Sequence, residues 1–329
     1  MTKKKQWLNT DSLPLLLFAL LFVTILTVFR ILQPAFLSID NLINMAKTAS
    51  NTVIAAIGLT FVITIAYSDI SFYMTSCFCG VLMAWLVSKG WHPVPAILVG
   101  AAAGAVWGGV SGVAVGKLKL PAIITTIAIG SIGFGLGYIF SDGAFIMQNF
   151  IESKTHYLSE MRFFGVPLPV FIMLAVVFFS FFLLERSKFG RNFYAVGAKE
   201  KAAYLSGVHV NRTILTAYVL CGLFAAVAAL IMTAQQGYGN VKISMNMLMP
   251  CFTAVYIGMS VFKRPCVLGT TLGALLVTTL STGFTSINIA YYWSNLVTGF
   301  VLITALLLSK VHVSRRETEG QTAKEGVEA

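Results

Sequence analysis

Charged residues are scarce in this chain, and their scarcity decides its class. Of the 329 residues, 11% are charged and 57% are hydrophobic, whereas soluble domains have roughly 25% charged residues. So few charges cannot cover a water-facing surface. Apolar runs of about 18 residues or more, long enough to cross a bilayer, recur from residue 13 to residue 308. The composition therefore excludes a soluble globular protein and predicts an all-α polytopic membrane protein.

The patterns that mark enzymes and metal sites are also missing. The nearest match to a phosphate-binding loop, GVAVGKL at 112–118, has the wrong glycine spacing and lacks Ser or Thr after Lys117. The four histidines are scattered over loops on both faces, with no carboxylate at metal-ligand spacing. The five cysteines lie in or beside apolar runs, so we interpret them as buried free thiols. We expect no catalysis, bound metal or bound cofactor in this chain, and we rank a membrane enzyme last among the alternatives.

Ten apolar segments are predicted to cross the membrane. They are 13–32, 49–66, 71–88, 94–115, 121–141, 167–185, 213–234, 248–262, 267–284 and 289–308. The chain is thus divided into a leader, 1–12, a single membrane domain, 13–309, and a tail, 310–329. The tail is polar enough that we expect it to be disordered.

The net charge of +11 is distributed unequally between the two sides of these spans. Ten spans place both termini on one side, and that side carries 17 of the 23 Lys and Arg residues, against six on the other. Because cytoplasmic loops of membrane proteins are enriched in Lys and Arg, both termini are predicted to be cytoplasmic. The basic excess is therefore a signal of topology rather than of nucleic-acid binding.

Glycines recur every four residues in the fourth predicted span. They are Gly100, Gly104, Gly108, Gly112 and Gly116. Such a strip lets another helix backbone approach closely, and it is common in membrane bundles. We therefore interpret it as a packing surface rather than a ligand site.

Ionisable residues at membrane depth are few, and Asp69 in AYSDISFYMTS (66–76) stands out among them. A carboxylate inside a membrane is costly and is often functional. Asp69 would equally serve as a helix cap if the second and third spans turn here at the cytoplasmic surface. Both interpretations stay open. A single acid gives thin support for a proton relay, which uses a chain of ionisable groups.

A passage for a neutral polar solute would be lined by amides, hydroxyls and aromatic faces. The candidates for such a translocation path are Asn51, Asp69, Ser71, Asn288, Tyr291 and Asn295. Tyr291 also fits an aromatic belt at the membrane interface. No particular substrate follows from these residues alone.

The stretch FGRNFYAVGAKEKAAYLSG (189–207) is polar and basic, although apolar spans lie on both sides of it. It belongs to the largest predicted cytoplasmic segment, 186–212. Residues 199–207 are compatible with a short helix that ends at Gly207. So short a helix needs neighbours or a partner to hold it. Its small side chains and the surrounding basic residues suit a cytoplasmic partner that moves it.

Four motifs, taken in order, resemble the membrane subunits of ribose-type ABC importers, a family that includes permeases for ribose, related sugars and autoinducer-2. KFGRNFYAVGAKEKAAYLSGVHVNRT (188–213) is similar to the cytoplasmic coupling loop of that family. The others are NTVIAAIGLTFVITIAYSDIS (51–71), LKLPAIITTIAIGSIGFGLGYIFSDG (118–143) and LGTTLGALLVTTLSTGF (268–284). The order, the spacing and the total length agree as well, so the resemblance covers most of the chain.

The resemblance implies a type II-like ABC importer permease, an all-helical bundle of about ten spans in the bacterial inner membrane, with its passage at the axis of a dimer. A separate cytoplasmic ATPase would use ATP and magnesium, and an extracytoplasmic binding protein would deliver a sugar or sugar-like solute. A second permease subunit would complete a homo- or heterodimer. The residues implied to couple to the ATPase are Phe189, Gly190, Arg191, Tyr194, Ala195, Gly197, Ala202, Ala203, Leu205, Ser206 and Gly207.

The chain departs from this family at two places. The family usually has Gly-Gly-Ile-Asp-Leu-Ser-Val-Gly-Ser where this chain has AYSDISFYMTS, and it has glycine turns where this chain has YIGMSVFKRPCVLG (256–269). Because lost glycines remove backbone freedom, the local geometry is expected to differ. We hypothesise that the chain is the diverged member of a heterodimeric pair. The alternative function is an ion-coupled carrier of a small polar solute, with Asp69 as its coupling group.

Overall fold

The computed structural model describes residues 13–290 and 293–305, and in these residues nine helices are long and apolar enough to cross a membrane. They are α1 (Leu13–Leu32), α2 (Ile39–Thr64), α3 (Ser71–Ser88), α4 (Pro93–Gly116), α5 (Ala122–Ser141), α7 (Leu168–Phe181) continued by the π-helix η1 (Phe182–Arg186), α10 (Val210–Gln236), the 3-10 turn η2 (Met245–Met247) continued by α11 (Leu248–Phe262), and α12 (Val267–Ser286). The prediction of a polytopic helical membrane protein is confirmed.

The tenth predicted span, 289–308, runs past the described residues. A shorter apolar helix, Trp293–Ala305, lies in the described part of that range. The predicted leader, 1–12, and the predicted tail, 310–329, lie outside the described residues.

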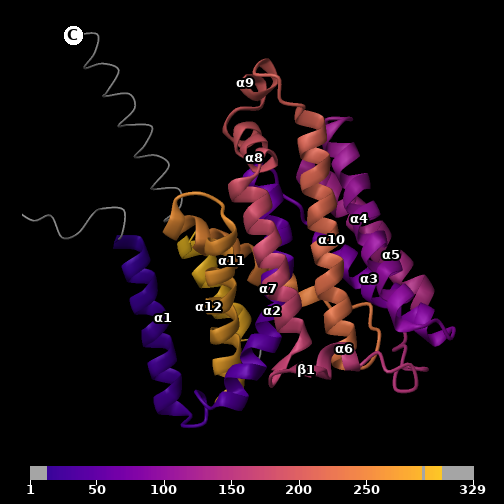
Figure 1. Ribbon diagram of the computed structural model, residues 1–329, viewed down its shortest axis with the longest axis vertical. Helices are drawn as coiled ribbons and strands as arrows, with labels where there is room; N and C mark the ends of the chain where they lie inside the picture. The colour runs from indigo at the N-terminus through magenta and orange to yellow at the C-terminus, as the bar shows by residue number, and fades with distance from the viewer. Residues whose placement is uncertain (1–12, 291–292, 306–329) are drawn as a thin grey trace, which may run out of the picture.

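Short elements lie at the two ends of the bundle (Figure 1). One end carries α8 (Lys188–Ala198) and α9 (Glu200–Leu205), and we call it the α9 end. The opposite end, called the α6 end, carries α6 (Tyr157–Glu160) and the antiparallel pair β1 (Arg162–Phe163) and β2 (Val166–Pro167).

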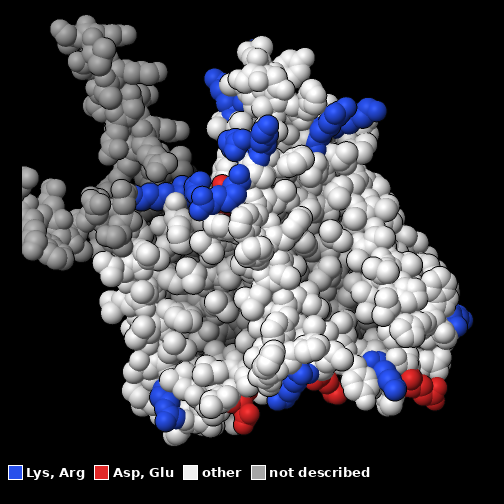
Figure 2. Space-filling view, in the orientation of Figure 1, with Lys and Arg blue, Asp and Glu red and all other residues white. Residues whose placement is uncertain are grey.

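Charge differs between the two ends. In Figure 2, Lys and Arg side chains gather at the α9 end, whereas the α6 end shows both signs of charge. The faces between the two ends are almost entirely uncharged in that view, as lipid contact requires. The distribution agrees with the predicted concentration of basic residues on one side of the membrane.

The helix α2 begins about ten residues before the predicted second span, 49–66, and includes polar residues that hydropathy alone leaves out. The Ser38 hydroxyl accepts a hydrogen bond from the Asn41 backbone N–H, at 3.3 Å, and so caps the helix. Asp40 lies in the first turn, where a negative charge is favourable. The helix therefore starts in a polar region at the α6 end and crosses the whole bundle.

The centre of the bundle is formed by α2 and α10, most of whose residues are buried. In contrast, α1 lies at the outside of the bundle, where most of its described side chains are exposed and only Phe29 is buried (Figure 1). A Cβ added at Gly104 would meet the Gly222 carbonyl oxygen, and one added at Gly108 would lie 3.0 Å from the Tyr218 carbonyl carbon. The predicted glycine strip thus packs α4 directly against the backbone of α10, and its interpretation as a packing surface is confirmed.

Candidate functional site

The candidate site is the pair of short helices α8 and α9, which project from the bundle between η1 and α10 (Figure 1). Ser187 caps α8, because its hydroxyl accepts a hydrogen bond from the Gly190 N–H at 3.2 Å. Lys199 is extended (φ −162°) and separates the two helices. After α9, Gly207 adopts φ +83°, a left-handed conformation that glycine accepts without strain. The predicted end of the short helix at Gly207 is confirmed, whereas α8 was not predicted as a helix.

The inner face of α8 is packed closely on the part of the core at the α9 end. A Cβ at Gly197 would clash with the Thr64 carbonyl oxygen at the end of α2. The ring of Phe193, which is fully buried, lies 5.7 Å from the ring of Phe61. The Tyr194 hydroxyl donates to the Pro265 carbonyl oxygen at 2.7 Å. Any displacement of α8 therefore also moves the end of α2 and the connection between α11 and α12.

Glu200 holds α9 to two loops of the bundle. Its carboxylate lies 2.6 Å from the Lys119 ammonium group and accepts a hydrogen bond from the Tyr67 hydroxyl at 3.0 Å. The hydrogen bond from Lys119 lowers the pKa of Glu200, whereas burial and the neighbouring Glu200 raise the pKa of Tyr67 to about 12. At neutral pH, Glu200 is therefore ionised and Tyr67 remains a donor. One carboxylate joins α9 to the α2–α3 and α4–α5 connections.

A second ionic contact ties the base of α8 to the other half of the bundle. The Glu185 carboxylate lies 3.6 Å from the Arg264 guanidinium and accepts a hydrogen bond from the Val267 N–H at 3.3 Å. The same guanidinium lies 5.4 Å from the centre of the Tyr194 ring, within reach of a cation–π contact. The site is thus anchored at three connections between spans.

The outer face of the site presents apolar side chains to water. Leu205 is 77% exposed, Tyr204 is 70% exposed, and Phe189 is 60% exposed. Beside Phe189, a pocket of about 210 Å³ separates α8 from the start of α10. It is lined by Phe189, Asn192, Phe193, His209, Arg212, Thr213 and Thr216. Exposed apolar groups within a basic surface (Figure 2) are typical of a protein-docking site rather than of a solvated loop.

The residues that the sequence assigns to coupling fall on both faces of this site. Exposed are Phe189, Arg191, Ala202, Leu205, Ser206 and Gly207. Buried or half-buried are Gly190, Tyr194, Ala195, Gly197 and Ala203. The first group is available to a partner, whereas the second positions the two helices on the bundle. Their coupling role stays a prediction.

Sequence reasoning missed Glu200, Tyr67 and Lys119 as parts of the site. Lys119 and Tyr67 lie 81 and 133 residues from Glu200 along the chain, so no local pattern joins them. A signal was nevertheless present. When the Asp of the family's usual Gly-Gly-Ile-Asp pattern is aligned with Asp69, the two glycines correspond to Ala66 and Tyr67. Ala66 keeps a left-handed backbone, φ +60°, and Tyr67 supplies a side chain that binds α9.

Asp69 is fully buried in the connection between α2 and α3, at the α9 end. Its Oδ1 atom accepts hydrogen bonds from the Ser71 N–H, at 2.7 Å, and from the Ser71 hydroxyl, at 2.5 Å. Burial raises the pKa of Asp69, although these bonds oppose the shift. The N-cap of α3 is Ile70, which has no side-chain cap, so Asp69 is not the predicted N-cap; it lies one position before the N-cap and accepts from Ser71, the first helical residue. A functional role for Asp69 stays a prediction. Among the described residues, no group of His, Cys, Asp and Glu side chains is arranged to hold a metal ion.

The other path candidates do not form one lining. Asn51 is buried in α2 and donates to the Gln235 side-chain oxygen at 2.8 Å. Asn288 follows α12 and is exposed, and Asn295 is exposed on the Trp293–Ala305 helix. Tyr291 lies outside the described residues. A shared role for these residues in a path stays a prediction.

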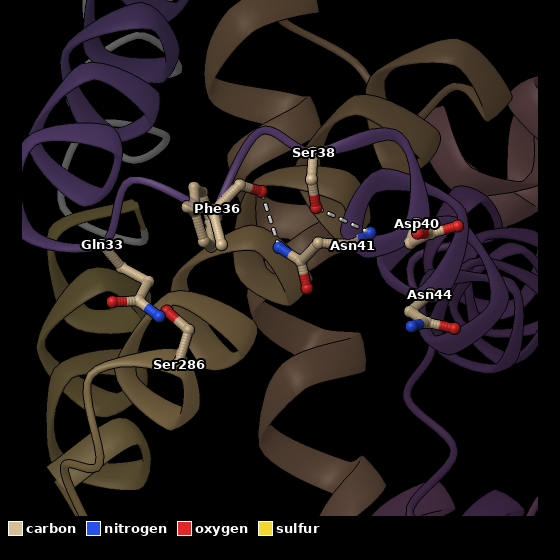
Figure 3. Close-up of a pocket in the computed structure, with 8 residues that line it drawn as sticks. Gln33, Phe36, Ser38, Asp40, Asn41, Asn44 and Ser286 are labelled. Carbon is tan, nitrogen blue, oxygen red and sulfur yellow. Dashed lines mark hydrogen bonds between the residues drawn. The ribbon is translucent and has the colours of Figure 1, made fainter.

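A polar hollow of about 310 Å³ lies at the α6 end, where the α1–α2 connection meets the end of α12. Figure 3 shows it with the Asn41 amide donating to the Phe36 carbonyl oxygen, at 2.6 Å. It is lined by Gln33, Ala35, Phe36, Ser38, Asp40, Asn41, Asn44 and Ser286. Because it lies at the end of the bundle opposite to α9, it is separate from the coupling site.

Comparison with known protein families gives a match over most of the chain. The family described as "Branched-chain amino acid transport system / permease component" matches residues 41–306. No solved structure matches the chain.

Individual relatives are similar along most of their length. The ribose import permease protein RbsC of Bacillus subtilis is 30% identical, over 88% of this chain and 90% of that protein. The L-arabinose transport system permease protein AraH of Escherichia coli is 28% identical, over 92% of each chain. The autoinducer 2 import system permease protein LsrC of Klebsiella pneumoniae is 29% identical, over 87% of this chain and 83% of that protein.

Proposed function

Because this chain belongs to the family of branched-chain amino acid transport system permease components, we propose that it is the membrane subunit of an ATP-driven importer for a sugar or sugar-like solute. The observation that carries the proposal is the projecting α8–α9 site, whose outer face is apolar and exposed within a basic surface. A carrier driven by an ion gradient has no use for such a docking surface. The ion-coupled alternative is also disfavoured by the relatives, which are named as import or transport system permeases.

The proposed substrate class follows from the relatives and from the chemistry of the chain. The relatives are named for ribose, L-arabinose and autoinducer 2. Among the described spans, polar groups are mainly hydroxyls and amides such as Asn51 and Gln235, which can exchange hydrogen bonds with a hydroxyl-bearing solute.

Three partners complete the proposed transporter, a multi-pass assembly in the bacterial inner membrane. The concentration of Lys and Arg at the α9 end supports a cytoplasmic location for that end, and the proposal assigns both termini to the same side. A cytoplasmic ATPase docks on α8 and α9 and holds the ATP and magnesium. A binding protein delivers solute at the α6 end, and a second permease subunit, identical or different, completes the passage. The permease itself has no catalytic role.

The geometry suggests how movement of the ATPase reaches the spans. A push on α9 acts through Glu200 on the α2–α3 and α4–α5 connections. A push on α8 acts through the Gly197 backbone on the end of α2 and through Tyr194 on the α11–α12 connection. Alternating access then requires two packings of the bundle whose balance these contacts shift.

Uptake into proteoliposomes tests the proposed function. The purified permease is reconstituted with its ATPase and binding protein and offered labelled ribose, L-arabinose or autoinducer 2. We expect uptake of at least one solute only when ATP and the ATPase are present, and none when an ion gradient replaces ATP. Uptake driven by the gradient alone would favour the carrier instead. Preparations without the ATPase serve as the control.

A further inference from the structure

The connection between the spans α10 and α11 is non-helical and enters the bundle. Gly237, with φ +72°, ends α10, and no helix forms again before η2 at Met245. Ser244 in this segment is fully buried. A Cβ at Gly80, in the middle of α3, would lie 3.5 Å from Ile243 Cγ2, so the segment reaches the interior of the bundle. Non-helical backbone at this depth occurs where it is enclosed by protein or lines a polar cavity.

A pair of amides lies beside the connection between α10 and α11. The Asn51 amide nitrogen donates to the Gln235 side-chain oxygen at 2.8 Å, and Gln235 is the residue before the last of α10. The Gln235 amide nitrogen lies 3.4 Å from the Lys47 carbonyl oxygen, one turn away on α2. The Cys251 sulfur of α11 lies 3.9 Å from the Thr52 carbonyl oxygen. The amides therefore lie where α2, the end of α10 and the first turns of α11 meet.

One atom of this pair is left without a partner. Asn51 is only 7% exposed, and its Oδ1 atom has no hydrogen-bond partner among the described residues. A buried acceptor that makes no hydrogen bond destabilises the fold. The Lys47 carbonyl, in contrast, already accepts a hydrogen bond from the Ser50 hydroxyl at 2.6 Å. Asn51 thus keeps an unused acceptor at the junction of three spans, in a site that packing alone would fill better with an apolar residue.

We propose that Asn51 Oδ1 accepts a hydrogen bond from a hydroxyl group of the transported solute as it passes the junction of α2, α10 and α11. Asn51 is then a residue that contacts the solute and determines specificity, whereas Gln235 ties α10 to α2 through the Asn51 amide nitrogen. The inference rests on the proposed function and names one contact within it. The unused acceptor requires a hydrogen-bond donor, which in the proposed class of sugar or sugar-like solutes is a hydroxyl group.

A purely structural tie between α2 and α10 is the competing explanation, and three variants with one control separate it from solute contact. Asn51→Ala removes both the tie and the acceptor. Gln235→Ala removes the tie and leaves the acceptor. Asn51→Leu also removes the acceptor but nearly keeps the side-chain volume. Gln236→Ala, at the exposed next residue of α10, is the matched control.

The measurement is the maximal uptake rate at saturating binding protein, for the transported sugar and for its singly deoxygenated analogues. We expect wild type to discriminate about tenfold against the analogue that lacks one particular hydroxyl, the energy of roughly one hydrogen bond. Asn51→Ala and Asn51→Leu should transport that analogue and the parent sugar at the same rate. Gln235→Ala and Gln236→Ala should keep the discrimination.

Two results would overturn the inference. One is discrimination by Asn51→Leu and Asn51→Ala that equals wild type for every analogue. The other is an equal loss of rate in Asn51→Ala and Gln235→Ala with discrimination intact in both, which assigns the pair to packing. Failure of the proposed function looks different, because the wild-type assembly then takes up none of ribose, L-arabinose and autoinducer 2 in an ATP-dependent way.

Discussion

Replacing Gly108 by alanine is expected to destabilise the bundle by about 3 kcal/mol, the upper part of the range for inserting an atom into a packed interior. The new Cβ would meet the Tyr218 carbonyl group and lie 3.2 Å from Gly222 Cα, so backbone rather than a flexible side chain has to move. The helices α4 and α10 must separate, and the contact between them is the most extensive in the bundle.

The adjacent glycine gives a matched control. A Cβ at Gly109 would lie 3.6 Å from Val219 Cγ2, an ordinary contact, so Gly109→Ala should be neutral or slightly stabilising through its higher helix propensity. The measurement is thermal unfolding in detergent together with the amount of protein in the membrane. We expect a melting temperature lower by roughly 5 °C or more for Gly108→Ala alone. Equal behaviour of the two variants would show that α4 does not pack on α10 in this register.

Reversing the charge of Glu200 is expected to lower solute uptake per ATP hydrolysed by about tenfold, equivalent to ~1.4 kcal/mol of coupling between the ATPase and the passage. In Glu200→Lys two cations face each other where Lys119 and the carboxylate are now 2.6 Å apart. The side chains are 51% and 41% exposed, so the pair contributes little to stability, and the variant should reach the membrane in normal amounts. The expected loss is in the coupling of ATP hydrolysis to uptake, and the folding of the permease is unchanged.

The double variant Lys119→Glu with Glu200→Lys restores the opposite charges and is expected to recover most of the coupling. Tyr67 can accept from the new ammonium group, so its contact is kept. Because the pKa of Glu200 is lowered, the wild-type contact is present above the ordinary carboxyl pKa of 4.5 and is lost only as the pH falls through the lower value in the folded protein. Coupling should therefore be constant across the neutral range. A double variant as defective as Glu200→Lys would contradict a role for the ion pair.

The positions of the spans were predictable because the lipid around each helix requires apolar side chains, and hydropathy detects them. The predicted third span, 71–88, coincides with α3, and the fourth and ninth differ from α4 and α12 by at most two residues at either end. The early start of α2 was missed because the residues around Asn41 are polar and their capping depends on Ser38. From hydropathy alone, polar residues at the end of a long helix are predicted as a loop.

The candidate site was predictable only in part. The position of α9 and its end at Gly207 follow from local chemistry, since a glycine with φ +83° needs no distant partner. The helix α8 was missed because its inner face is defined by contacts with Thr64 and Pro265, which lie far away in the sequence. The break between the seventh and eighth predicted spans was expected, because residues 237–246 include Asn240, Lys242 and Ser244, but the burial of Ser244 was not, because it depends on packing against distant helices.

The positions where this chain lacks the family's glycines gain a side-chain contact that the sequence did not predict. In the two stretches where the family has glycines, Ala66 and Lys263 adopt left-handed conformations, with φ +60° and +59°. Non-glycine residues are strained there. The added side chain of Tyr67 instead forms a contact with α9 that a glycine cannot make.

Cross-linking at Leu205 tests the central claim, that α9 carries the docking surface for a cytoplasmic ATPase. Leu205 is 77% exposed at the α9 end, and Ile151, 82% exposed on the loop before α6, is the control. The five native cysteines are buried and unpaired, so they leave the background of a thiol-specific reagent low.

Leu205→Cys and Ile151→Cys are each labelled with a maleimide that carries a photoreactive benzophenone, in inside-out vesicles that contain the complete transporter, and are then irradiated. The account predicts a covalent product of permease and ATPase from Leu205→Cys and none from Ile151→Cys. It further predicts that the Leu205 product changes in yield when ATP is added. Absence of the product at Leu205, or an equal product at Ile151, would contradict it.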